Sequence, residues 1–106
     1  MAAPVMTERR FYVYFMTNYS RRVLYIGVTN DVERRIWEHR QGKGSEFAKT
    51  YHVDRLVYVE EYPTAPEAIA REKQLKGWKR VRKNALVAES NPKWEDLVPE
   101  ENTPSS

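Results

Sequence analysis

Tyrosines and a glycine stand at corresponding places in two short apolar runs near the start of the chain. In residues 11–16, Tyr12 and Tyr14 alternate with apolar side chains. In residues 23–28, Tyr25 is followed two positions later by Gly27. Because side chains alternate between the faces of a strand, the hydroxyl-bearing rings share one face. A strand tyrosine ordinarily packs in the core with its hydroxyl at the rim, and a strand glycine often marks a close approach of a backbone or ligand. The combination indicates a wetter face that is open to hydroxyl chemistry.

Charged side chains with possible functions lie on two expected helices. Glu72 falls within the apolar stripe that Ala68 and Leu75 form along one of them. An inward-facing carboxylate must be paired, hydrogen-bonded or bound to a cation, since burying it alone is costly. A buried ion pair with an arginine such as Arg35 and a functional carboxylate both meet this requirement. On the other helix, Arg35 and His39 are four residues apart, so they can face the same place.

The elements that must position these residues begin with a β-hairpin. The two apolar runs are β-branched and aromatic, and residues 17–22 between them are rich in turn formers. If Met16 pairs with Val23, the antiparallel register places Tyr14 directly opposite Tyr25.

Start and stop signals predict the remaining elements. Asn30 followed by Glu33 fits a capping box, and Gly42 can end the helix that follows. The expected elements are then a helix over residues 31–41, a loop over 42–50, a strand over 56–62, a helix from the cap Thr64 to about residue 80, and a short helix over 85–89. The order is β-β-α-β-α plus a short C-terminal helix, which predicts a small α/β (α+β) fold.

Length and composition restrict the classes of protein. A chain of 106 residues with 41% hydrophobic residues suits one small domain. The absence of cysteine excludes disulfides, thiolate nucleophiles and sulfur-ligated zinc, and favours a reducing compartment. No run approaches the length of a membrane helix and the start lacks an apolar signal segment, so we expect a cytoplasmic protein with a domain over residues 9–97 and disordered tails over 1–8 and 98–106.

The basic residues are compatible with a polyanionic partner. Residues 1–94 contain all 18 Lys and Arg but only 11 of the 15 Asp and Glu, a balance of +7. Basic residues on a helix often serve only to keep one face solvated. Charge alone therefore leaves both interpretations open.

Taken in order along the chain, these residues resemble the GIY-YIG nuclease domain. The hairpin carries Tyr12-Val13-Tyr14 and Tyr25-Ile26-Gly27, Arg35 follows Tyr25 by ten residues, and Glu72 follows in the next long helix. The likeness covers about residues 10–97. It is greatest to small stand-alone bacterial proteins related to the N-terminal incision domain of the excision-repair nuclease. The resemblance implies a three-stranded mixed sheet flanked by helices.

The resemblance also implies the functional residues. Two positions depart from the family pattern: Tyr12 replaces the first glycine, and Val28 stands where the excision-repair relatives carry a lysine, so a lysine-assisted step there is in doubt. The implied catalytic residues are Tyr14 and Tyr25 as the motif tyrosines, Arg35 as the motif arginine, His39, Glu72 as the metal ligand, and Asn91 as the late polar residue.

Hydrolysis of a phosphodiester fits this set. One Mg²⁺ or Mn²⁺ held by a single carboxylate and waters suits Glu72. Arg35 can donate two hydrogen bonds to the phosphate, and Tyr14 is expected to act as base or to position the water, with Tyr25 holding the phosphate or sharing that role. DNA phosphates would be contacted by Lys43, Lys49, Lys73, Lys76, Lys79 and Arg80, and unpaired bases could stack on Trp37, Phe47 and Tyr51.

The expected activity is therefore that of a divalent-metal-dependent DNA endonuclease in DNA repair, recombination or DNA uptake. Single-stranded or branched DNA is preferred to plain duplex as the substrate, and a monomer or weak dimer is expected. Two other interpretations stay open: a nucleic-acid-binding module with weak or no catalysis, and an adaptor that contacts a repair protein through the acidic residues past Leu97.

Overall fold

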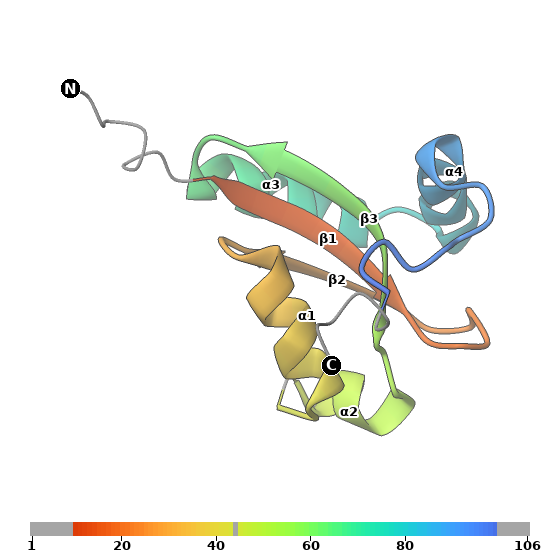
Figure 1. The fold of residues 1–106 in the computed structure, drawn as a ribbon. Helices are drawn as coiled ribbons and strands as arrows, with labels where there is room; N and C mark the ends of the chain where they lie inside the picture. The colour runs from red at the N-terminus through yellow and green to blue at the C-terminus, as the bar shows by residue number, and fades with distance from the viewer. Residues whose placement is uncertain (1–9, 44, 100–106) are drawn as a thin grey trace.

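The computed structural model describes residues 10–43 and 45–99. Its centre is a three-stranded sheet in the order β2-β1-β3, formed by β1 (Phe11–Thr17), β2 (Leu24–Thr29) and β3 (Arg55–Tyr62). Both neighbours of β1 run antiparallel to it (Figure 1). The sheet is thus antiparallel throughout and not mixed, because the long connection after β2 returns β3 to the far side of β1.

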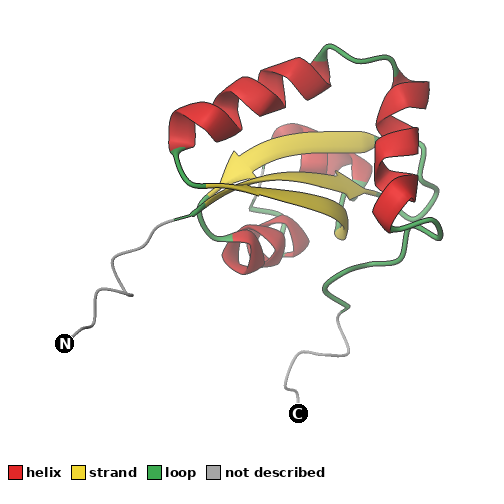
Figure 2. Cartoon of the chain, turned by 90° about the horizontal axis from the view of Figure 1, so that it is seen from above, coloured by secondary structure: helices red, strands yellow, loops and turns green. Residues whose placement is uncertain are grey.

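Strand alternation divides the interior into two cores. On β1, Val13 and Phe15 face one core, whereas Tyr14 and Met16 face the other, and all four are at most 1% exposed. A sheet that is apolar on both faces must be covered on both. Figure 2 shows helices on either side of the strands, and the predicted α+β fold class is confirmed.

The first face carries two helices, one of which the sequence did not predict. The helix α1 spans Val32–Arg40, and its N-cap is Asp31, whose side chain accepts a hydrogen bond from the Arg34 N–H. The predicted cap at Asn30 is therefore wrong by one residue. The expected loop over 42–50 is also wrong, because Ser45 caps a six-residue helix, α2 (Glu46–Tyr51), anchored by the buried Ala48.

The second face carries α3 (Ala65–Lys76) and α4 (Arg80–Ser90). Thr64 caps α3 as predicted, but the helix ends at Gly77, before the predicted end near residue 80. Here Trp78 packs against the core with the guanidinium of Arg82 3.8 Å from its ring centroid. Trp78 lies in the short connection between α3 and α4. The helix α4 starts earlier and is longer than the short helix expected over 85–89.

A bulge in β3 explains how the C-terminal segment is held. Phe15 lies opposite Tyr58 and Met16 opposite Leu56, which leaves Val57 as an extra residue without a partner in the ladder. The Asn91 amide donates to the Val57 carbonyl at 3.1 Å. It also exchanges hydrogen bonds with the Glu95 backbone, at 2.9 and 3.0 Å.

The same segment covers the outer edge of β3. The Leu56 carbonyl accepts a hydrogen bond from the Leu97 N–H, and the Leu56 N–H donates to the Asp96 carboxylate. Asp96 is in turn paired with Arg40 at 2.7 Å, which joins the segment to α1. Val98 still packs against the core, while nearly all of the predicted tails lie outside the described residues.

The helices of the described part of the chain are all too short or too polar to cross a membrane.

Asn91→Ala should lower the free energy of unfolding by about 1–3 kcal/mol, because it leaves the buried Val57 carbonyl without its donor. Chemical denaturation measures the change. Asn30→Ala is the matched control: Asn30 is exposed, and its change should stay within about 0.5 kcal/mol. Equal stability of the Asn91 variant and the control would contradict this account of Asn91.

Candidate active site

Four of the six predicted catalytic residues come together between the sheet and α1. The Tyr14 ring, on β1, lies 6.1 Å from the Tyr25 ring on β2. From α1, the Arg35 Nε donates to the Tyr14 hydroxyl at 3.3 Å, and the His39 Nε2 lies 3.4 Å from the same oxygen. His39 also stands edge-on to Tyr25, with the centroids 5.2 Å apart. The Tyr14 hydroxyl is therefore the centre of the cluster.

The register that produces this cluster differs from the predicted one. Tyr14 lies opposite Gly27, and Tyr25 opposite Met16, so the predicted direct pairing of the two tyrosines is wrong. The hairpin is offset by two residues, which keeps both rings on the same face as diagonal neighbours. The rings still meet because a one-residue slip would change the face and a two-residue slip does not.

Gly27 is required by the position of Tyr14. A Cβ atom at residue 27 would lie 2.6 Å from the Tyr14 hydroxyl oxygen and 2.7 Å from the ring carbon that bears it. The aromatic ring therefore lies directly over the Gly27 backbone. The sequence signal of a close approach at this strand glycine is explained by this ring.

Burial sets the protonation of the cluster. Burial raises the pKa of Tyr14 to about 12, although the hydrogen bond from Arg35 opposes this. The Arg35 guanidinium stays charged, since its bond to Tyr14 raises its own pKa. Burial, and secondly the charge of Arg35, lower the pKa of His39. Arg35 can only donate in its hydrogen bond to Tyr14, so the Tyr14 hydroxyl keeps its own proton to donate, and His39 Nε2 accepts it in the tautomer of the neutral ring that carries its proton on Nδ1.

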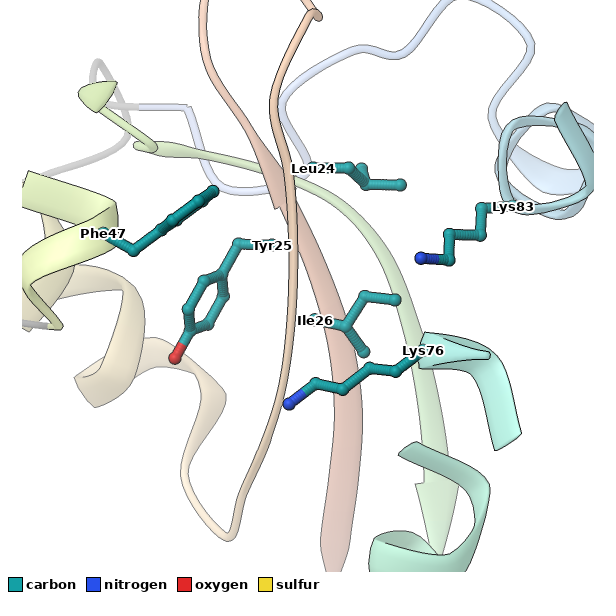
Figure 3. A pocket seen from close by; sticks show the side chains of 6 residues that line it. All are labelled: Leu24, Tyr25, Ile26, Phe47, Lys76 and Lys83. Carbon is teal, nitrogen blue, oxygen red and sulfur yellow. The ribbon is translucent and has the colours of Figure 1, made fainter. Parts of the chain in front are cut away.

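Glu72 lies on α3, on the opposite side of the sheet from this cluster. Its side chain is 19% exposed and pairs with the Lys76 ammonium at 3.0 Å. The partner is thus a lysine one turn along the helix and not Arg35, which is paired with Glu38 at 3.0 Å. Lys76 and Tyr25 nevertheless line the same open pocket of about 250 Å³, so the two sides meet around the free edge of β2 (Figure 3).

The described residues offer no enclosed metal site. Among them, no group of three His, Cys, Asp or Glu side chains could enclose an ion. Mg²⁺ keeps several waters and is commonly held by one or two carboxylates together with substrate phosphate. Glu72 is half-buried, and its ion-pair partner is the flexible side chain of Lys76. A single carboxylate of this kind fits a largely hydrated ion.

Asn91 is hydrogen-bonded to the backbone of β3 and of the segment that follows α4. Its amide is committed to the backbone of Val57 and Glu95, which explains why a polar side chain can be 7% exposed there. The structure accordingly gives it the task of holding the chain end. Its predicted catalytic role remains a prediction.

The predicted phosphate-binding residues are spread over several surfaces. Arg80 has a structural task, because its guanidinium donates to the carbonyls of Arg21 and Arg22 in the hairpin turn. Lys43 lies over the Trp37 ring at 5.4 Å. Of the others, Lys49 is on α2, Lys73 and Lys76 are in the last turn of α3, and Lys79 is the N-cap residue of α4.

Two residues at the site were missed by the sequence prediction. Glu38 pairs with Arg35, and Lys83 lines the pocket with Tyr25. The three-residue spacing from Arg35 was a readable signal for Glu38. Lys83 was not, because it reaches the pocket only through the placement of α4.

Comparison of the chain with known proteins identifies its family. The model of the GIY-YIG catalytic domain family matches residues 10–84, which is more than half of the chain. The chain therefore belongs to the GIY-YIG family, a nuclease family.

Individual relatives narrow this class to small stand-alone proteins. The chain is 38% identical over 66 residues to the UPF0213 protein SSP2268 of Staphylococcus saprophyticus, covering 62% of this chain and 80% of the relative. It is 37% identical over 78 residues to the UPF0213 protein HQ_3675A of Haloquadratum walsbyi, covering 74% and 86%. The solution structure of the UPF0213 protein BH0048 from Bacillus halodurans is similar, with a TM-score of 0.53, 29% identity, and coverage of 91% of this chain and 99% of that one.

Gly27→Ala should lower the free energy of unfolding by about 1–3 kcal/mol, because the added methyl group overlaps the Tyr14 ring. Gly77→Ala is the matched control, since its new Cβ would meet nothing closer than 3.5 Å. That variant should be unchanged or slightly more stable. Equal effects in denaturation would show that the Tyr14 ring does not occupy the space over Gly27.

The raised Tyr14 pKa should make stability fall at high pH. The unfolded chain releases this proton near pH 10 and the folded protein near pH 12, so the folded state holds more protons between these values. The free energy of unfolding should then drop by up to about 3 kcal/mol through that window. Tyr14→Phe should show a shallower decrease in denaturation curves measured across the same range, and an identical decrease in both proteins would contradict the assignment.

Proposed function

We propose that this protein is a divalent-metal-dependent endonuclease that hydrolyses phosphodiester bonds in DNA. The observation that carries the proposal is the Tyr14 hydroxyl held between the Arg35 guanidinium and the His39 ring. Attack of water on a phosphate diester needs a group that accepts a proton from the water and a cation that stabilises the negative charge. Tyr14 with His39 can serve as the first and Arg35 as the second.

The chain's own residues supply a route for the proton of the attacking water. Tyr14 is protonated at neutral pH, so it can accept that proton only while passing its own to the neutral His39 Nε2. The new bond forms between water oxygen and phosphorus as the bond to the leaving oxygen breaks. Arg35, whose side chain is 34% exposed, can reach a nonbridging phosphate oxygen, and Tyr25 at the pocket mouth can hold another.

Glu72 would hold the Mg²⁺ or Mn²⁺, which supplies charge neutralisation at the phosphate. The support for this role is its half-buried position and its ion pair with Lys76, which lines the pocket at the β2 edge together with Tyr25. Lys76 is then free to exchange its partner from the carboxylate to a substrate phosphate.

Single-stranded or branched DNA is the proposed substrate, with DNA repair, recombination or uptake as the setting. Three aromatic side chains of α1 and α2, Trp37, Phe47 and Tyr51, are between 45% and 53% exposed, and Phe47 lies next to Tyr25. Unpaired bases have free faces that can stack on such rings. A catalytically weak binding module is the second candidate, and the complete set of tyrosines, arginine and glutamate argues against it.

Cleavage of labelled single-stranded, duplex and branched DNA with Mg²⁺, Mn²⁺ or EDTA tests the proposal. EDTA should abolish cleavage, and Glu72→Gln, Arg35→Lys and Tyr14→Phe should each lower the rate by at least about 100-fold while DNA binding persists.

Neighbouring residues provide controls for the two charged positions. Glu67→Gln changes an exposed acid on α3, and Arg34→Lys an exposed base on α1. Both should cut at the wild-type rate. A wild-type protein that binds DNA without cutting any of these substrates would favour the binding module instead.

A further inference from the structure

The pocket at the β2 edge is built from both layers of the molecule. Leu24, Tyr25 and Ile26 of β2 form its floor, Phe47 reaches it from α2, and Lys76 and Lys83 reach it from α3 and α4. Its volume is about 250 Å³ and it is open along the strand. An open groove of this size suits part of an extended chain better than a whole enclosed ligand, for which pockets of roughly 300–1,000 Å³ are usual.

Positive charge gathers on the α3 and α4 side of the groove. Figure 3 shows the Lys76 and Lys83 side chains extending toward β2 on either side of Ile26. The six lining residues include no acid. Each ammonium group can donate to the acceptor oxygens of a phosphate on this side of the groove, Lys76 by exchanging its partner from the Glu72 carboxylate.

Aromatic rings occupy the other side of the same strand. The Phe47 ring is 6.2 Å from Tyr25 and 4.9 Å from Tyr51. Phe47 and Tyr51 are 45% and 48% exposed. Because both ring pairs are tilted, at 35° and 48°, Phe47 is not closed off by a parallel stack and presents area to solvent.

We propose that this groove is a nucleotide-binding subsite in which a single DNA strand crosses β2, with a phosphate between Lys76 and Lys83 and an unpaired base stacked on Phe47. The subsite deepens the proposed function and rests on it, since Tyr25 belongs to both the groove and the catalytic cluster. A base inside a duplex has both faces covered by its neighbours, so the Phe47 contact selects for unpaired DNA. Cleavage next to an unpaired nucleotide follows from this arrangement.

Binding measured in EDTA tests the subsite without cleavage. Fluorescence anisotropy with a short labelled oligothymidylate, and separately with a blunt duplex, gives the dissociation constants. Phe47→Leu keeps an apolar side chain but removes the ring, so it should weaken single-strand binding by at least about fivefold and leave duplex binding unchanged. Lys83→Gln should lower the slope of log affinity against log salt by about 0.7, the value for one phosphate contact on a single strand. Lys83 is chosen because Lys76 is also paired with Glu72.

Residues outside the groove supply the matched controls. Tyr19 is an aromatic residue that is 83% exposed in the hairpin turn, and Lys93 is an exposed base near the chain end. Tyr19→Leu and Lys93→Gln should bind both DNAs like the wild type, and equal unfolding midpoints would show that all four variants fold.

The outcomes separate the subsite from the proposed activity. The subsite would be overturned, even if the enzyme cuts DNA, if Phe47→Leu and Lys83→Gln both kept the affinity and salt slope of the wild type. It would also be overturned if Phe47→Leu weakened duplex and single-strand binding equally. Wild-type protein that never cuts, yet loses single-strand binding in the groove variants, would overturn the nuclease activity and leave the subsite standing.

Discussion

The Tyr14 ring packed over the Gly27 backbone is the contact on which the remaining site depends. It places a phenol that is 1% exposed inside the sheet face. Burying a hydroxyl without partners is costly, and here the cost is offset by Arg35 and His39 from α1. The same two hydrogen bonds therefore dock α1 on the sheet and assemble three of the chemical groups. The packing of α1, to which the buried Ile36 also contributes, and the geometry of the proposed catalytic cluster therefore share contacts.

The free edge of β2 joins the two halves of the chemistry. Tyr25 faces the α1 side, whereas Glu72 and Lys76 belong to α3 on the other side, and the pocket that includes Tyr25 and Lys76 spans the strand between them. A central strand could not do this, because its neighbours would separate the layers. The sheet order β2-β1-β3 leaves β2 at an edge, while the other edge, at β3, is closed by the segment that ends with Leu97. One edge is thus covered by the C-terminal segment, whereas the other borders the pocket that Tyr25 and Lys76 line.

The closed edge is organised by Asn91, which lies beyond the 10–84 span matched by the family model. Its hydrogen bond to the extra residue of the β3 bulge satisfies a carbonyl that the ladder leaves unpaired. A polar residue near a catalytic domain's end can therefore be retained for folding alone. Both N–H donors of the Asn91 side chain are used, by the Val57 and Glu95 carbonyls, and its oxygen accepts from the Glu95 N–H.

Local patterns in the sequence determined the three strands, the Thr64 cap of α3 and the face shared by Tyr14 and Tyr25, since strand alternation and helix capping act over a few residues. The pair Arg35 and His39 was predictable for the same reason, as both lie on one helical turn. The two-residue hairpin offset, the α2 helix and the break at Gly77 were decided by tertiary packing of Tyr14 over Gly27, of Ala48 and of Trp78. Likewise, only the folded chain could show that Glu72 pairs with Lys76, that Asn91 closes a bulge and that Lys83 reaches the β2 edge. These are contacts between side chains on separate elements, whose distances depend on how the layers pack and leave no local trace in the order of residues.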